Sequence, residues 1–232
     1  MKRIACILLV LICSFCIFAC SKFDESYVYD GKSLIGKWCE EDYDEASYIT
    51  YEFFKDGTAE LREYKYGIEF SKDTGTYTVD KNVMIIKFVE EYSSSVYYVE
   101  NKFSITEDGE LVMVYLDKND EMSEEEMVLV PYNIDFVEDN SSIVGTWEDK
   151  AHKGEYWTFK KDYTGTISAG GGGGASYTFY YSVNDDCIYI ANEFVPGIKN
   201  DLIRYDFDVD GDTLELETTI NGTDVKLSFT RR

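Results

Sequence analysis

Acidic side chains occupy every second position in Asp206-x-Asp208-x-Asp210. Gly211 follows directly, and Glu217 lies six residues further on. This spacing fits a calcium-binding loop, in which the acidic side chains wrap around one ion between two helices. Apolar residues alternate with these acids, and such alternation is typical of a β-strand. Neighbours on one strand face lie about 6.6 Å apart, which is too extended for a wrapped site. We therefore expect an acidic strand face, and a calcium site is the less favoured alternative.

Few other side chains suggest catalysis. His152 is the only histidine, so a Ser-His-Asp triad would have to be built around it, and the sequence contains no Gly-x-Ser-x-Gly turn. The glycines at 170–174 lack the Lys-Ser/Thr that completes a phosphate loop, and we expect a hairpin loop there. The sequence also lacks a Cys-x-x-Cys pair, so a zinc site is unsupported. We predict that the chain is not an enzyme and that it needs no cofactor.

The elements that would position these residues belong to an internal repeat. Leu34-Ile35-Gly36-Lys37-Trp38 reappears as Ile143-Val144-Gly145-Thr146-Trp147, and three further blocks recur in the same order. Each copy shows about eight short alternating segments, separated by Asp-Gly, Asn-Gly or polar turns that favour tight hairpins. No helical period of useful length appears after residue 20. The pattern predicts an all-β chain of two tandem up-and-down antiparallel barrels, because closing each sheet removes its exposed edges.

The predicted organisation has five parts. They are a signal peptide at 1–19, a lipidated tether at 20–33, a first barrel at 34–131, a polar linker at 132–142 and a second barrel at 143–232. A closed eight-stranded barrel is either filled by side chains or just able to hold one small ligand.

The Gly-x-Trp motifs at Gly36, Trp38, Gly145 and Trp147 open the first strand of each copy. Together with the later blocks they resemble the lipocalin-like domains of Bacteroidota lipoproteins, over residues 34–131 and 143–230. The resemblance implies that each Trp packs at a closed barrel end beneath an Arg from the last strand. Arg231 or Arg232 is available to Trp147, whereas the first copy has no such Arg. We expect the motif residues to be structural, and the resemblance implies a cavity for a ligand.

The N-terminus has the pattern of an export signal. A short basic segment precedes an apolar run at residues 4–19, which is too short for a comfortable membrane span. The run ends in Ile17-Phe18-Ala19-Cys20, which resembles the bacterial lipobox. This resemblance implies cleavage between Ala19 and Cys20 and attachment of fatty acyl chains to Cys20, and two or three such chains anchor a protein stably.

The residues after Cys20 suggest a location. Ser21, Lys22, Asp24 and Glu25 resemble the export signal that sends Bacteroidota lipoproteins to the outer face of the outer membrane. A plain solvated tether is the alternative, so both the cell surface and the periplasmic face remain open.

Cys39 and Cys187 lie in different copies, and they form either one bridge between domains or two free thiols; free thiols are favoured.

The composition narrows the choice of partners. The chain holds 45 acidic residues against 22 basic ones, a formal net charge of -23. Nucleic-acid binders depend on Lys and Arg to neutralise phosphates, so we exclude that class. Membrane contact is expected only through the lipid anchor.

Two functions from different classes fit this sequence. The first is an envelope-anchored lipoprotein whose lipocalin-like domains bind a small apolar or aromatic molecule. The second is a structural or interaction subunit at the outer membrane that contacts envelope proteins or glycans through exposed tyrosines. A lined cavity in a barrel would favour the first, and solidly filled barrels would favour the second.

Overall fold

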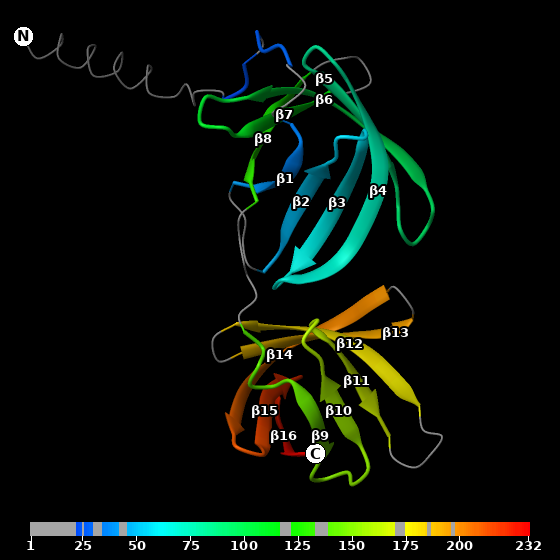
Figure 1. The fold of residues 1–232 in the computed structure, drawn as a ribbon, viewed down its shortest axis with the longest axis vertical. Coiled ribbons are helices and arrows are strands. Elements are labelled where there is room, and N and C mark those ends of the chain that lie inside the picture. The colour runs from blue at the N-terminus through cyan, green and yellow to red at the C-terminus, as the bar shows by residue number, and fades with distance from the viewer. Residues whose placement is uncertain are drawn as a thin grey trace, which may run out of the picture.

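The computed structural model describes residues 22–24, 26–29, 34–41, 46–116, 122–132, 139–169, 175–184, 187–195 and 198–232. These residues form two closed antiparallel barrels in tandem, and this confirms the predicted fold class (Figure 1). Barrel 1 consists of β1 (Gly36–Glu40), β2 (Tyr48–Phe53), β3 (Thr58–Lys65), β4 (Ile68–Asp80), β5 (Val83–Val89), β6 (Val96–Ile105), β7 (Leu111–Leu116) and β8 (Met122–Pro131). Barrel 2 consists of β9 (Gly145–Asp149), β10 (Tyr156–Phe159), β11 (Thr164–Ser168), β12 (Ser176–Asn184), β13 (Cys187–Val195), β14 (Ile198–Asp210), β15 (Thr213–Ile220) and β16 (Thr223–Arg231).

Each strand pairs with the next one along the chain, so both barrels are simple meanders. Barrel 1 closes where β1 pairs with β8, with Trp38 opposite Pro131. Barrel 2 closes where β9 pairs with β16, with Trp147 opposite Arg231. Two eight-stranded antiparallel barrels in tandem fit a lipocalin-like fold.

The repeated sequence blocks gather at one end of each barrel, called here the Trp end. The Trp38 indole N–H donates to the Leu34 carbonyl at 2.9 Å, and the Trp147 indole N–H donates to the Ile143 carbonyl at 2.8 Å. On β4 and β12, the hydroxyl groups of Tyr77 and Tyr181 donate to the carbonyls of the turns after β2 and β10. The repeated residues therefore make the same closing contacts at the Trp end of both barrels.

Four strands extend at least three residues beyond their predicted bounds. Alternation of apolar residues predicts strands near 75–80, 125–131, 187–192 and 201–209. In the structure β4 begins at Ile68, β8 begins at Met122, β13 continues to Val195 and β14 begins at Ile198. In β4 the extra residues include charged side chains on the outer face, so they carry no clear apolar period. They pair with β3 through the backbone, and two of them, Glu69 and Lys72, also form ion pairs with its side chains.

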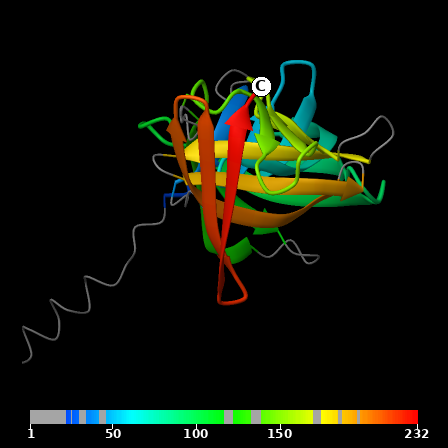
Figure 2. The ribbon, with the colours of Figure 1, turned by 90° about the horizontal axis from the view of Figure 1, so that it is seen from below.

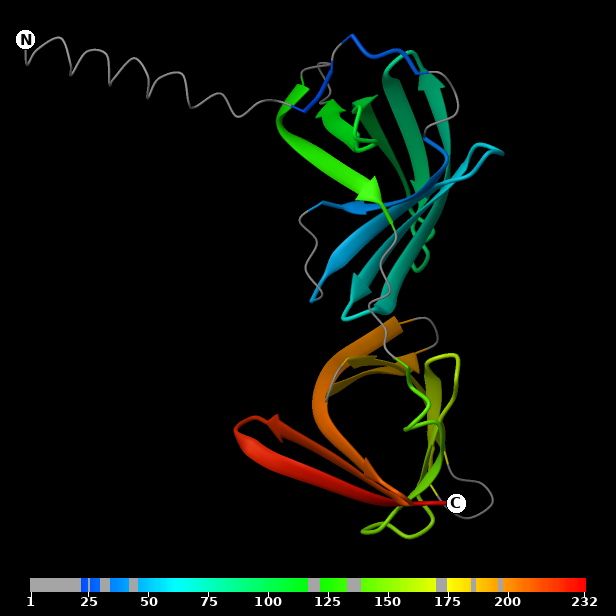
Figure 3. The same ribbon diagram turned by 60° about the vertical axis from the view of Figure 1, so that its left-hand side comes forward.

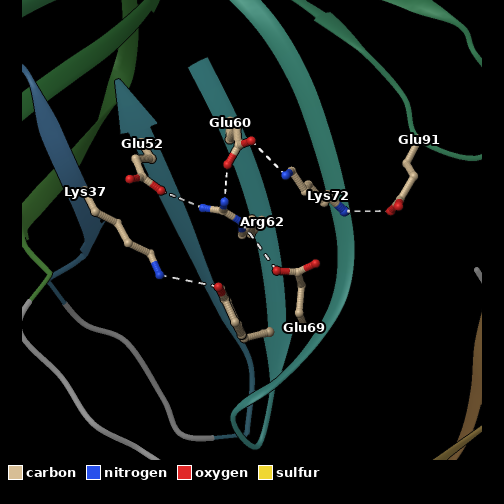
Figure 4. Close-up of polar contacts among 8 residues, drawn as sticks. Lys37, Glu52, Glu60, Arg62, Glu69, Lys72 and Glu91 are labelled. Atoms are coloured by element: carbon tan, nitrogen blue, oxygen red, sulfur yellow. Dashed lines mark hydrogen bonds and ion pairs between the residues drawn. The ribbon is translucent and has the colours of Figure 1, made fainter. Parts of the chain in front are cut away.

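These ion pairs cross the outer face of β2, β3 and β4 (Figure 4). Arg62 lies at the centre, with only 15% of its side chain exposed, and pairs with Glu52 at 2.8 Å, with Glu69 at 3.3 Å and with Glu60. Lys72 on β4 pairs with Glu60 at 2.7 Å. Pairs of opposite charge on neighbouring strands thus stabilise the β2–β3–β4 part of the barrel.

The described residues before β1 cover the Trp end of barrel 1. Tyr27 and Tyr29 meet the Phe103 ring edge-on, with centroids 5.7 and 5.5 Å away. The Asp24 backbone N–H donates to the buried Ser104 hydroxyl at 3.0 Å. Lys22 pairs with an acidic side chain of the barrel at 2.8 Å. This part of the predicted tether is therefore packed on barrel 1.

The two barrels touch through the turn between β3 and β4. Tyr66 in this turn stacks on Tyr189 of β13 with centroids 4.0 Å apart, and its carbonyl accepts a hydrogen bond from Ser182 of β12. On the other side of barrel 2, the β15–β16 hairpin projects away from the remaining strands (Figures 2 and 3).

Candidate functional site

A cavity of about 370 Å³ lies within barrel 1, on the side away from the Trp end. Its wall combines five apolar or aromatic side chains with five polar or acidic ones. The lining residues are Glu40, Tyr51, Val99, Asn101, Met113, Tyr115, Ser123, Glu125, Glu126 and Met127. A volume of this size is usual for a small-molecule site, and the wall offers such a ligand both apolar surface and polar groups.

Strand alternation explains why these side chains face inward. On β6, Val99 and Asn101 share a face with Phe103, which is fully buried in the core of barrel 1. On β7, Met113 shares the inward face with buried Leu111, and it lies opposite Met127 on β8. The same pleat that fills the Trp end with large side chains thus lines the cavity further along.

Barrel 2 has larger side chains at equivalent positions. Tyr51 lies opposite Trp38 in barrel 1, whereas Trp157 lies opposite Trp147 in barrel 2. Asn101, two residues before Phe103, corresponds by register to Tyr205, which is 6% exposed.

Aromatic rings fill the interior of barrel 2. Trp157 lies 5.4 Å from the Phe229 ring and 5.9 Å from the Phe179 ring, and Phe159 lies 5.1 Å from Phe179. Among the described residues, aromatic side chains therefore fill the core of barrel 2, whereas barrel 1 has a cavity beside its core.

The cavity of barrel 1 has an acidic wall. Burial raises the pKa of Glu40, which is the last residue of β1, although a hydrogen bond from the Ile49 backbone acts in the opposite direction. Burial and, to a lesser extent, the charge of Glu40 raise the pKa of Tyr51 to about 12, so the phenol stays protonated at neutral pH. Glu125 and Glu126 line the same cavity from β8, and no Lys or Arg of the described residues lines it.

The Gly-x-Trp residues lie outside this cavity, at the Trp ends. Arg231 stacks over the Trp147 ring at 4.2 Å and donates to the Val144 and Ser142 carbonyls at 3.0 and 2.9 Å. Gly145 has a φ of +144°, and a Cβ there would lie 3.1 Å from the Arg231 guanidinium. Both the backbone and the Arg therefore require glycine in barrel 2.

The equivalent positions of barrel 1 lack this Arg. Pro131 lies opposite Trp38, and a Cβ added to Gly36 would meet nothing within 4 Å beyond its chain neighbours. Gly36 nevertheless has a φ of +141°. Glycine at residue 36 is thus required by the backbone conformation alone.

The predicted lipidation and export residues are only partly described. Ala19, Cys20, Ser21 and Glu25 lie outside the described residues, as do the predicted signal peptide at 1–19, the glycines at 170–174 and part of the predicted linker. Within the described residues, no helix has the length and apolar character to cross a membrane.

The acidic set at 206–217 lies on two strands. Asp206, Asp208 and Asp210 are exposed on β14, and Asp206 lies opposite Glu217 on β15. Glu217 pairs with Lys226 at 2.6 Å. These side chains therefore form the acidic strand face that alternation predicted, and they do not surround a common point.

Another group of potential metal ligands was missed by sequence reasoning. Asp149, His152 and Glu155 bring one ligand atom each to within 4.8 Å of one another in the β9–β10 loop. The buried Asp149 carboxylate accepts from the Ala151 backbone at 2.7 Å and contacts the His152 ring at 2.9 Å. Glu155 accepts from the Trp157 indole at 3.1 Å. These hydrogen bonds stabilise the conformation of the β9–β10 loop, which accounts for the three side chains lying close together.

A larger pocket of about 670 Å³ lies beside the projecting β15–β16 hairpin. It is lined almost entirely by polar and charged residues, among them Arg204 and Lys226, whose charges are met by neighbouring acids. This groove is more polar than the cavity of barrel 1.

The two cysteines among the described residues, Cys39 and Cys187, are free. Cys39 is buried in barrel 1, and Cys187 is partly exposed in barrel 2 beside Arg204. The favoured prediction of two thiols is therefore confirmed, although Cys187 is not fully buried.

Residues 141–229 are similar to a family of unknown function, DUF5640. The matched segment spans β9 to β15 and most of β16. No curated protein matches the chain.

Proposed function

We propose that the protein is a binding protein of the cell envelope that holds a small molecule with an apolar body inside barrel 1. The cavity of about 370 Å³ carries this proposal, because its size and lining suit a small ligand. The tandem barrels are compatible with such a role. The lipobox-like sequence ending at Cys20 supports anchoring to the outer membrane, and no group among the described residues suggests catalysis.

Native mass spectrometry of the full chain, purified from its host, tests this proposal. A molecule that co-purifies with the wild-type protein should be lost from Val99→Trp, in which an indole occupies the cavity. Tyr98→Trp is the matched control, since this neighbouring side chain is 64% exposed on the outer face of the same strand. Retention of the molecule by Val99→Trp, or its absence from folded wild-type protein, would contradict binding in barrel 1.

A contact role is proposed for barrel 2. Its filled core leaves its surface as the part available for interaction, and the β15–β16 hairpin projects from it with Ile220 exposed (Figure 3). Crosslinking in cells from a photoreactive residue at 220 should capture an envelope protein. Capture at the same level from residue 107, in a turn of barrel 1, would indicate that the hairpin has no special role.

A further inference from the structure

Glu40 and Asp149 occupy the same position in the two barrels. Each follows a Gly-x-Trp motif by two residues and ends the first strand of its barrel. The register agrees, because Glu40 lies opposite Leu129 in barrel 1 and Asp149 lies opposite Phe229 in barrel 2. Both barrels therefore place a carboxylate on the inner side of the first strand.

In barrel 2 the chain itself satisfies this carboxylate. Asp149 is 3% exposed and accepts hydrogen bonds from the Ala151 and His152 backbone N–H groups at 2.7 and 3.3 Å. The His152 ring lies 2.9 Å from its second oxygen, and this contact raises the pKa of His152. The loop after β9 thus brings two backbone donors and the His152 ring to this acid.

In barrel 1 the corresponding carboxylate lacks such a partner. Glu40 receives a hydrogen bond from the Ile49 backbone, and no Lys, Arg or His of the described residues forms an ion pair with it. It faces the cavity together with Glu125. A partly buried carboxylate with one neutral donor is stabilised strongly by a cation that enters the same space.

The rest of the cavity suits a cation with an apolar body. Asn101 is 5% exposed and lines the cavity with its side chain. Its carbonyl oxygen can accept from an ammonium group. Tyr51 and Tyr115 add aromatic faces that attract cations, while Met113 and Val99 offer apolar surface.

We propose that the ligand of barrel 1 is an organic ammonium ion whose charged group pairs with Glu40 and whose apolar part lies against Met113 and Val99. This inference rests on the proposed binding function and names the chemical class of the ligand. The strongly acidic chain, with a net charge of -23, also favours the approach of cations.

The test compares two probes of the same shape, n-octylamine, which is charged at neutral pH, and 1-octanol, which is neutral. Isothermal titration calorimetry on the full chain should show the amine binding roughly 10- to 100-fold more tightly than the alcohol. Glu40→Gln keeps the size of the side chain and should remove most of this difference without changing the affinity for 1-octanol. Glu107→Gln makes the same charge change in an exposed turn at the Trp end and should leave both affinities unchanged.

The possible results separate this inference from the proposed function. Equal binding of both probes, abolished by Val99→Trp, would overturn the ammonium class while the cavity remains a binding site. An amine preference that persists in Glu40→Gln would overturn the role of Glu40. Binding of neither probe would overturn the inference, and native mass spectrometry would still decide whether barrel 1 holds another molecule. Circular dichroism of Glu40→Gln shows whether a lost affinity reflects an unfolded barrel.

Discussion

The clearest test of how barrel 2 closes is removal of the Arg231 side chain. Its guanidinium makes two hydrogen bonds to backbone carbonyls and stacks over Trp147. Taking about 1 kcal/mol for each hydrogen bond and about 1 kcal/mol for the cation–π contact at this partly exposed site, we expect Arg231→Ala to destabilise barrel 2 by about 3 kcal/mol.

Barrel 1 should not share this loss, because Pro131 occupies the corresponding position. Urea denaturation followed by pulsed hydrogen exchange and mass spectrometry can measure the two barrels separately through their own peptides. With m values of about 1–2 kcal/mol per molar urea, the midpoint of the β9–β16 peptides should fall by roughly 1.5–3 M. The β1–β8 peptides should keep their midpoint.

Arg232→Ala is the matched control for this measurement. Arg232 is 56% exposed and pairs with Glu148, and exposed ion pairs contribute at most about 1 kcal/mol. If Arg231→Ala moved the barrel 2 midpoint no further than Arg232→Ala does, the Arg–Trp contact would not be what holds this end closed. An equal shift in barrel 1 would show that the effect is not local.

Three more predictions concern packing, charge and pH. A Cβ at Gly165 would lie 2.1 Å from the Phe179 ring, so Gly165→Ala should destabilise barrel 2 by about 2–3 kcal/mol, and Phe179→Leu should relieve part of this loss in a double-mutant cycle. Arg62→Ala removes the cation that pairs with Glu52 and Glu69, while Glu60 keeps its pair with Lys72, so the urea midpoint of barrel 1 should fall by an amount equivalent to about 2 kcal/mol. Asp149 raises the pKa of His152, so the stability from this pair is present below the ordinary His value of 6.5 and is lost as the pH rises through the higher folded pKa. The midpoint of barrel 2 should therefore fall over this range in the wild type and stay level in His152→Asn.

Much of the fold was predictable because the signals are local. Alternation in 205–209 and 225–229, together with Asp-Gly and Asn-Gly turns, marks strands and hairpins whose order alone gives a meander. The repeat added the tandem arrangement, and the Trp–Arg contact in barrel 2 appeared at Arg231, one of the two residues that the resemblance suggested. What these signals could not give was the length of β4, where charged residues on the outer face conceal the apolar period.

The cavity was harder to predict, because the repeated motifs lie at the Trp ends and the cavity lies elsewhere in the barrel. The shared motifs of both copies lie at the Trp ends, whereas the cavity depends on positions where the copies differ, such as Asn101 in place of Tyr205 and Tyr51 in place of Trp157. Whether a barrel is hollow depends on the summed volume of side chains from several strands, and this sum cannot be taken until the register of every strand is known. Glu40 could not be singled out for the same reason, because in the sequence it is one of 45 acidic residues. Only the closed sheet shows that its side chain lines the cavity. This position, without a paired cation among the described residues, is the basis of the proposed ammonium ligand.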